Sequence, residues 1–200
     1  MLTYNDIVEG IEKLKKRGFI KTNRSGNTGI GKTLEDALGL EENNLPDPDG
    51  FTTELISTRK NSGSMLTLFT KSPEPRGVNS ELLKSFGYPG KGGKLHLLTT
   101  VNALEFNTLK GKTGFKIEIS VDKVNLLTSK KSLKPYWKKE TLQQILEKKY
   151  HELVYVRAES QGSGTNEQFH FNEAWFMRGF DFDNFVKLLH DGEIKVDIRI

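Results

Sequence analysis

The apolar residues of this 200-residue chain follow two periods, one helical and one of two residues, and these alternate irregularly along the sequence. Helical spacing predicts helices over residues 4–17, 32–39, 80–86, 138–149 and 181–192. Alternation and short apolar runs predict strands over residues 51–60, 64–71, 95–101, 115–121, 152–160, 167–176 and 193–200. Because the strands and helices follow no regular strand–helix–strand rhythm, we expect an α+β fold, in which helices flank a mixed central β-sheet.

Two pairs of these strands are close enough in sequence to form hairpins. FTTELISTRK and SMLTLFTK are separated by Asn61, Ser62 and Gly63, and ELVYVRAES and EQFHFNEAWF are joined by QGSGTN. Residues of these types favour turns, so we predict both hairpins. The last expected strand still alternates where the chain stops, which fits a truncated C-terminus as well as a natural end.

The composition favours a soluble globular protein, with 28% charged and 35% hydrophobic residues. No apolar run reaches the 18 or so residues that a membrane span needs. The N-terminus has no signal-peptide core, so we expect a cytoplasmic protein. The absence of cysteine excludes disulfides and thiolate metal sites.

The net charge of +4 is a weak indication of a polyanionic partner. The segment KKSLKPYWKK is more informative, because lysines can neutralise phosphates and aromatic rings can stack on bases. Its candidate DNA-binding residues are Lys130, Lys131, Lys134, Tyr136 and Trp137. A solvated loop leading into the next helix is the alternative interpretation.

The stretch GNTGIGKT, residues 26–33, matches the phosphate-binding loop of nucleotide hydrolases. Such a loop follows a buried strand and opens a long helix, but only Phe19 and Ile20 are apolar in the segment KLKKRGFIKTNRS before it. The context therefore argues against nucleotide hydrolysis. We expect the glycines to form a tight turn instead, with Thr28 or Thr33 capping the helix that follows.

Several carboxylates follow this turn and gather near the start of the next strand: Glu35, Asp47, Asp49 and Glu54. Mg²⁺ prefers oxygen ligands and commonly takes one or two carboxylates together with substrate phosphates. Spacing alone also permits another interpretation. In it, the two aspartates are turn residues of a Pro-Asp loop and Glu35 is a solvated helix residue.

The residues GNTGIGKTLEDALGLEENN and PDPDGFTTELISTRKNSGSMLTLFTKSP together resemble the MvaI/BcnI group of type II restriction endonucleases. These enzymes are relatives of the mismatch-repair nicking enzyme MutH within the PD-(D/E)XK nuclease superfamily. The resemblance is dense over residues 26–73 and continues more loosely in NEAWFMRGFDFDNFVKLL. It implies a Mg²⁺-dependent endonuclease that cleaves double-stranded DNA at a short specific site.

The resemblance also implies roles for the acidic residues. Glu54 is the strand acid and Asp49 the loop acid, and these two would hold the metal; Asp47 is the alternative to Asp49. Glu35 on the preceding helix would assist them.

The motif lysine of the family falls on Ile56, where this sequence departs from the pattern. Three interpretations follow. Another lysine, Lys60 or Lys71, takes over the role of the motif lysine, or the metal alone supports the reaction. In the third interpretation the protein binds DNA without cutting it. The last possibility, a catalytically impaired DNA-binding relative, is the alternative function.

The family organisation implies one two-lobed nuclease domain over residues 1–200. We expect a catalytic lobe mainly over 1–125 and a recognition lobe mainly over 126–200. His170, Asn172 and Arg178 are of types that read base edges, and are further DNA-binding candidates. We expect a monomer, and a cognate DNA methyltransferase is a candidate partner.

Overall fold

The computed structural model describes residues 4–40 and 53–200, and the chain divides into two compact units. Unit 1 comprises Met1–Leu66 with Lys148–Phe180, and unit 2 comprises Thr67–Glu147 with Asp181–Ile200. Both units are built from separate stretches of chain, and the boundary expected near residue 125 falls inside unit 2. The catalytic and recognition roles of the two parts stay a prediction.

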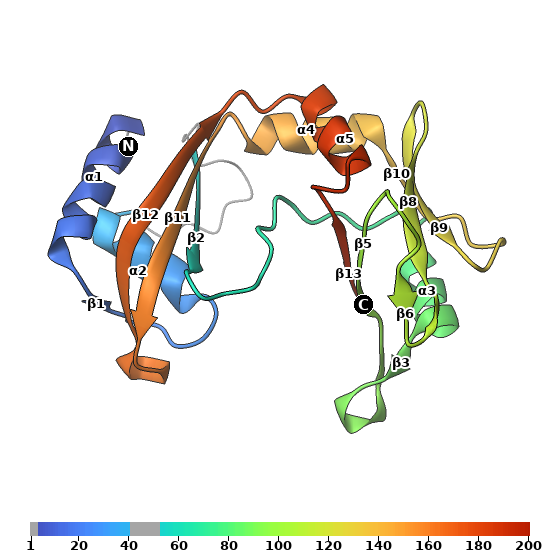
Figure 1. Ribbon diagram of the computed structural model, residues 1–200, viewed down its shortest axis with the longest axis horizontal. Helices are drawn as coiled ribbons and strands as arrows, with labels where there is room; N and C mark the ends of the chain where they lie inside the picture. Colours follow the sequence, from blue (N-terminus) through green and yellow to red (C-terminus); the bar gives the residue numbers. More distant parts are fainter. Residues whose placement is uncertain (1–3, 41–52) are drawn as a thin grey trace. The chain divides into compact units, whose positions relative to one another are not determined.

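Unit 1 is built on a four-stranded mixed sheet with the order β1-β12-β11-β2 (Figure 1). Its strands are β1 (Ile20–Lys21), β2 (Thr53–Arg59), β11 (Glu152–Gln161) and β12 (Gln168–Arg178). β11 and β12 form the predicted antiparallel hairpin, with the short helix η2 (Gly164–Asn166) between them. β2 runs parallel to β11. The expected α+β fold with a mixed sheet is thereby confirmed.

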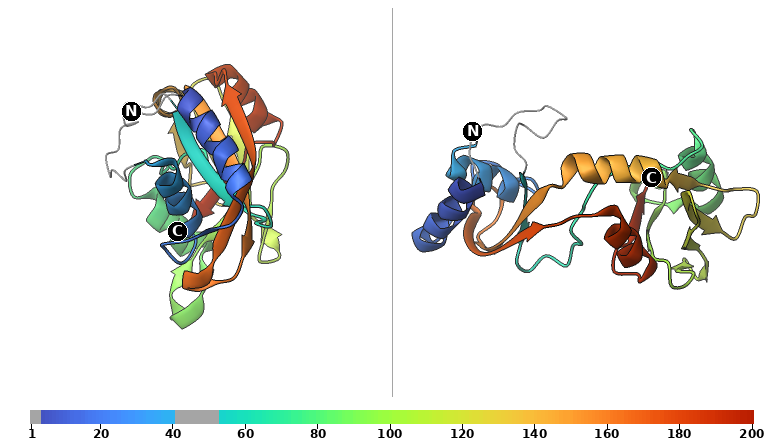
Figure 2. Two further views of the ribbon diagram at one scale, coloured as in Figure 1. Left: turned by 90° about the vertical axis from the view of Figure 1, so that its left-hand side faces the viewer. Right: turned by 90° about the horizontal axis from the view of Figure 1, so that it is seen from above.

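Helices α1 (Tyr4–Arg17) and α2 (Gly29–Leu38) lie on one face of this sheet (Figures 1 and 2). The stripe of Ile7, Ile11 and Leu14 predicted a helix over 4–17, and all three side chains are buried. α2 begins three residues before its predicted start and ends at Gly39, whose φ of 73° is readily adopted only by glycine.

The core of unit 1 lies between these helices and the sheet. Alternate residues of β11 point to the helices, and Val154, Val156 and Ala158 are fully buried there. Phe169 and Phe171 of β12 are also fully buried. We call this side of the sheet the helix face.

The other side, which we call the opposite face, carries alternate residues of the same strands: Glu54, Ile56 and Thr58 of β2, Tyr155 and Arg157 of β11, and Glu173 and Trp175 of β12. The hydroxyls of Thr58 and Tyr155 are 2.8 Å apart, and the rings of Tyr155 and Trp175 stack at 5.6 Å. This face therefore carries charged, hydroxyl and aromatic side chains, whereas the helix face is apolar.

Unit 2 contains short strands, three α-helices and one short 3₁₀ helix among its described residues. Its sheets have the orders β10-β9-β8, β13-β5, β3-β4 and β6-β7. The elements are α3 (Val78–Phe86), β3 (Tyr88–Pro89), η1 (Lys91–Gly93), β4 (Leu95–His96), β5 (Leu98–Val101), β6 (Thr108–Leu109), β7 (Lys112–Thr113), β8 (Phe115–Ile119), β9 (Lys123–Thr128), β10 (Tyr136–Lys138), α4 (Lys139–Lys149), α5 (Phe182–His190) and β13 (Val196–Arg199). α4 extends to Lys149, which belongs to unit 1.

The predicted strand over residues 64–71 is wrong, and so is its hairpin with β2. This segment has no regular secondary structure, and β2 pairs with β11 instead. Phe69 contacts the ring of Phe185 with 5.7 Å between centroids, while Met65 is exposed. The segment therefore packs through single side-chain contacts such as that of Phe69 with Phe185. Its apolar residues do not form one face of a β-sheet.

The predicted strand over 115–121 ends early, at Ile119. Val121 is 96% exposed, because the chain turns there and the Ser120 N–H donates to the Lys123 carbonyl at 2.9 Å. The apolar alternation had continued by chance into a hairpin turn.

The packing predicts a large stability loss on truncation of the β12 core. Phe171→Ala removes a fully buried ring and should lower the free energy of unfolding by about 3–5 kcal/mol. Met65→Ala, at a side chain that is 48% exposed, should change it by no more than about 0.5 kcal/mol. Urea denaturation followed by tryptophan fluorescence measures both. Equal effects of the two substitutions would contradict this core assignment.

Candidate active site

Glu54 lies near the start of β2 on the opposite face of the sheet. Its carboxylate Oε1 is 3.0 Å from the Nζ atom of Lys149, the last residue of α4. Both side chains remain partly exposed, with 29% of Glu54 and 37% of Lys149 accessible. The predicted strand acid is thus accessible and paired with an ammonium group.

Tyr150 follows Lys149 and is almost completely buried beside the Glu54–Lys149 ion pair. The Lys149 ammonium is 5.4 Å from the centre of the Tyr150 ring. Burial of the phenol, and secondly the negative charge of Glu54, raise the pKa of Tyr150 well above its ordinary value of 10.0. Tyr150 therefore stays neutral, and the positive charge beside Glu54 comes from Lys149.

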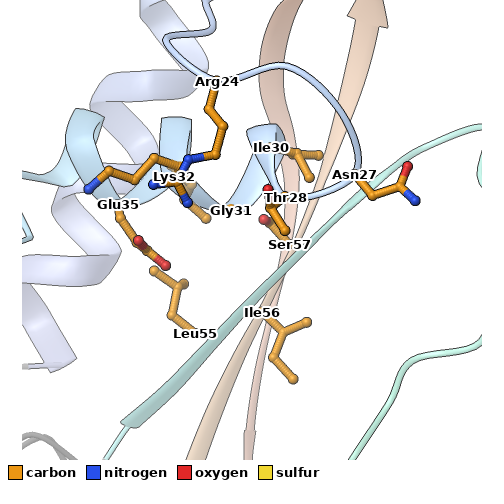
Figure 3. A pocket seen from close by; sticks show the side chains of 11 residues that line it. Arg24, Asn27, Thr28, Ile30, Gly31, Lys32, Glu35, Leu55, Ile56 and Ser57 are labelled. Atoms are coloured by element: carbon orange, nitrogen blue, oxygen red, sulfur yellow. The ribbon is translucent and has the colours of Figure 1, made fainter. Parts of the chain in front are cut away.

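Ile56 lies two residues beyond Glu54 on the same side of β2 and is paired in register with Tyr155. Its side chain points away from α2 in the close view of the neighbouring pocket (Figure 3). An aliphatic group at this position cannot donate a hydrogen bond to a phosphate. The family pattern is interrupted at a position that faces the same side as Glu54.

Lys60, the first substitute proposed from the sequence, forms its described ion pairs with carboxylates other than Glu54. The Nζ atom of Lys60 is 2.5 Å from Glu173 and 3.5 Å from Glu159. Its hydrogen bond to Glu173 is the main cause that raises the pKa of Lys60. Lys71 belongs to unit 2, where its backbone carbonyl accepts a hydrogen bond of 2.9 Å from the indole of Trp137.

Glu35 reaches β2 from α2, on the helix side of the strand. It lines a pocket of about 340 Å³ together with Arg24, Asn27, Thr28, Ile30, Gly31, Lys32, Leu34, Leu55, Ile56 and Ser57. Figure 3 shows the Glu35 and Leu55 side chains pointing toward one another. Glu35 therefore lies on the helix face of β2, whereas Glu54 lies on the opposite face of the same strand.

Asp49 and its alternative Asp47 lie outside the described residues. Across residues 4–40 and 53–200, no group of three or more His, Asp and Glu side chains is arranged to hold a metal ion. The assignment of Asp49 and Glu54 as metal ligands stays a prediction.

The glycine turn before α2 is packed against its own chain. A Cβ atom on Gly29 would lie 2.2 Å from the Arg24 carbonyl oxygen, so only glycine fits there. Thr33 donates to the Gly29 carbonyl at 2.7 Å, and its hydroxyl is 3.0 Å from that of Thr22. Thr28 occupies the N-cap position without a side-chain capping bond. Close packing thus requires glycine at position 29, while Gly26, a glycine of the phosphate-loop pattern, has a φ of 87°.

Arg59, at the end of β2, fixes this turn to the hairpin. Its guanidinium donates two hydrogen bonds to Glu167, of 2.6 and 2.7 Å, and a third of 3.0 Å to the Gly26 carbonyl. Arg59 also lies over the Phe169 ring, 5.1 Å from its centre. The bond from Arg59 is the main cause that lowers the pKa of Glu167 below its ordinary value, against the effect of burial.

The three predicted base-reading residues make contacts within unit 1. His170 Nε2 is 2.9 Å from the Lys15 carbonyl, and its ring is 5.5 Å from that of Phe19. Arg178 pairs with Glu152 at 3.0 Å. Asn172 lies at the bulge of β12, and its bond to Glu159 lowers the pKa of that carboxyl. Their role in DNA binding stays a prediction.

The lysine-rich segment of unit 2 combines exposed and packed residues. Lys131 and Lys134 are exposed, and Lys130 Nζ is 3.1 Å from the Ser85 hydroxyl. Tyr136 donates to Glu74 at 3.2 Å and carries the Lys123 ammonium over its ring. Trp137 is only 7% exposed, so its ring packs in unit 2 and has no free face for a base. The lysines are the better candidates for phosphate contact.

Comparisons with known proteins agree with one another over nearly the whole chain. The profile of the MvaI/BcnI restriction endonuclease family matches residues 8–200. The structure of restriction endonuclease MvaI in complex with its cognate DNA substrate is similar, with 33% identity and a TM-score of 0.84. The match covers 100% of this chain and 85% of that one.

A second structure, "Restriction endonuclease MvaI in the absence of DNA", has 33% identity and a TM-score of 0.56, with 100% of this chain and 84% of that one covered. No curated protein matches the chain. The similarity to these structures shows that this chain has the fold of the PD-(D/E)XK nucleases.

The Arg59–Glu167 pair predicts an acid-dependent loss of stability. A lowered carboxyl pKa stabilises the fold above the ordinary value of 4.5, and this contribution is lost as the pH falls through the lower pKa of the folded state. Arg59→Met leaves Glu167 without its donor and should cost about 1–3 kcal/mol in neutral buffer. The cost should shrink well below pH 4.5, where Glu167 becomes protonated.

Urea denaturation at both pH values measures this dependence. The control is Lys15→Met, which breaks an exposed ion pair of 3.3 Å with Glu12 and should cost less than about 1 kcal/mol. An Arg59→Met cost that is small in neutral buffer, or that grows in acid, contradicts the prediction.

Proposed function

This chain belongs to the MvaI/BcnI restriction endonuclease family, and we propose that it hydrolyses phosphodiester bonds of double-stranded DNA at a short specific site, with Mg²⁺ as cofactor. Membership makes it a type II site-specific deoxyribonuclease by class. The observation that carries the proposal is the position of Glu54: the acid expected from the family pattern lies partly exposed on β2, within a fold shared with MvaI.

Glu54 is suited to a hard divalent cation, because its carboxylate is accessible and points to the polar face of the sheet. We assign Asp49 as the second ligand, with Asp47 as the alternative, and Glu35 as an assisting acid. A cation bound there would supply Lewis acidity, which polarises the phosphodiester and lowers the pKa of a water. The protein's own contribution is to hold the oxygen ligands on a rigid strand beside the substrate phosphate.

The DNA contacts of the proposal come from positive charge and from the polar side chains of β12. Exposed Lys131 and Lys134, together with Lys130, are suited to phosphates. His170, Asn172 and Arg178 are candidates for contacts to bases, by residue type. We further propose a monomer in the cytoplasm that acts beside a cognate DNA methyltransferase. None of the described helices is long and apolar enough to cross a bilayer.

A second candidate function is DNA binding without cleavage. The observation that favours it is Ile56, whose aliphatic side chain occupies the position of the motif lysine. In that case the protein would retain the DNA-binding surface and metal ligands but lack the ammonium group that stabilises charge at phosphorus.

Incubation of long DNA of mixed sequence with the protein distinguishes the two functions. We expect discrete fragments in Mg²⁺ and none after EDTA treatment. Glu54→Gln should reduce the rate more than about 100-fold, because it removes a metal ligand. Glu9→Gln, an exposed acid of α1, should cleave like the wild type. Binding of DNA without any fragments would support the second function and contradict the first.

A further inference from the structure

We propose that Lys149 supplies the ammonium group that this chain lacks at position 56, and that it donates to the scissile phosphate beside Glu54. The inference rests on the proposed nuclease function and extends it to a residue outside the family motif. Its basis is the 3.0 Å contact between Lys149 Nζ and Glu54 Oε1.

The parallel pairing of β2 with β11 brings these two side chains together. Glu54 is in register with Leu153, and Lys149 precedes Leu153 by four residues, at the end of α4. Parallel strands start at the same edge of a sheet, so the residues that lead into β11 lie beside the start of β2. Lys149 therefore approaches Glu54 from the N-terminal edge of the sheet.

A lysine at position 56 would approach from the other direction. Residues two apart on a strand are separated by about 6.6 Å, within the reach of a lysine side chain. The two backbone positions thus differ, but both allow an ammonium to meet the Glu54 carboxylate. A phosphate oxygen placed at that carboxylate would lie within hydrogen-bond reach of Lys149, which has three donors and a flexible stem.

The contact is also of a kind that catalysis can use. Lys149 is 37% exposed, so its ammonium can exchange a carboxylate oxygen for a phosphate oxygen without unfolding the site. An ion pair between side chains this exposed adds little to stability. Substitution of Lys149 should therefore leave the protein folded and report on function.

Lys60, one of the substitutes expected from the sequence, is less suited to this role. Lys60 already contacts two carboxylates of the hairpin, Glu173 and Glu159. In the part of the chain that the structure describes, the ammonium group in contact with the Glu54 carboxylate is that of Lys149.

Four variants test the proposal in single-turnover cleavage of long mixed-sequence DNA with Mg²⁺. Lys149→Met should lower the rate at least about 100-fold, the usual cost of removing one donor to a developing negative charge. Lys148→Met is the matched control: it removes the adjacent lysine on the same helix and should cleave like the wild type. Ile56→Lys alone should change the rate little, and in the Lys149→Met background it should restore at least about a tenth of the lost activity.

Mn²⁺ binding, followed by electron paramagnetic resonance without DNA, provides a readout apart from activity. Lys149→Met should bind Mn²⁺ at least as tightly as the wild type, because the ammonium competes with the cation for Glu54. Loss of Mn²⁺ binding would assign Lys149 to the support of the metal site and overturn the proposal.

Unchanged cleavage by Lys149→Met, with the wild type active, overturns the assignment and leaves the nuclease function standing. The assignment is also overturned if the wild type is inactive and Ile56→Lys cleaves, because the lack of a lysine at position 56 is then the cause of the inactivity. If neither protein cleaves DNA, the nuclease function itself fails and the assignment fails with it.

Discussion

The parallel pairing of β2 with β11 is the constraint on which the rest of unit 1 depends. It joins a strand near residue 55 to one near residue 155 and sets seven residues in register. One side of both strands packs under α1 and α2, and the other carries Glu54, Ile56 and Thr58. A slip of one residue would exchange these sets and bury Glu54 in the apolar core. The same register brings Lys149 to Glu54.

The sequence was sufficient for elements whose signal is local. The apolar stripe of α1 and the hairpin of β11 and β12 depend on neighbouring residues, and the structure has both. The segment at 64–71 had an equally local strand signal and forms no strand. Hydrophobic alternation reports which residues can line a face, but a strand also needs a partner for its backbone. β11, with buried Leu153, Val154 and Val156, is the partner of β2.

The candidate site was predictable only in part. Glu54 and Glu35 were identified from the family pattern, and both lie at β2, Glu54 on the opposite face and Glu35 on the helix face. Lys149 was missed, although a lysine at the end of a predicted helix, just before a predicted strand, was visible in the sequence. Its relevance depends on the parallel register, a long-range pairing that local patterns do not encode. Trp137 illustrates the converse, since its neighbours suggested an exposed aromatic ring and packing has buried it.

A crystal structure of the protein with DNA and Mn²⁺, with the cation located by its anomalous scattering, tests the account most directly. The account predicts a cation on the Glu54 carboxylate and the Lys149 ammonium within hydrogen-bond distance of the phosphate beside it. A cation bound away from Glu54, or a phosphate contacted by another lysine while Lys149 points elsewhere, would contradict it.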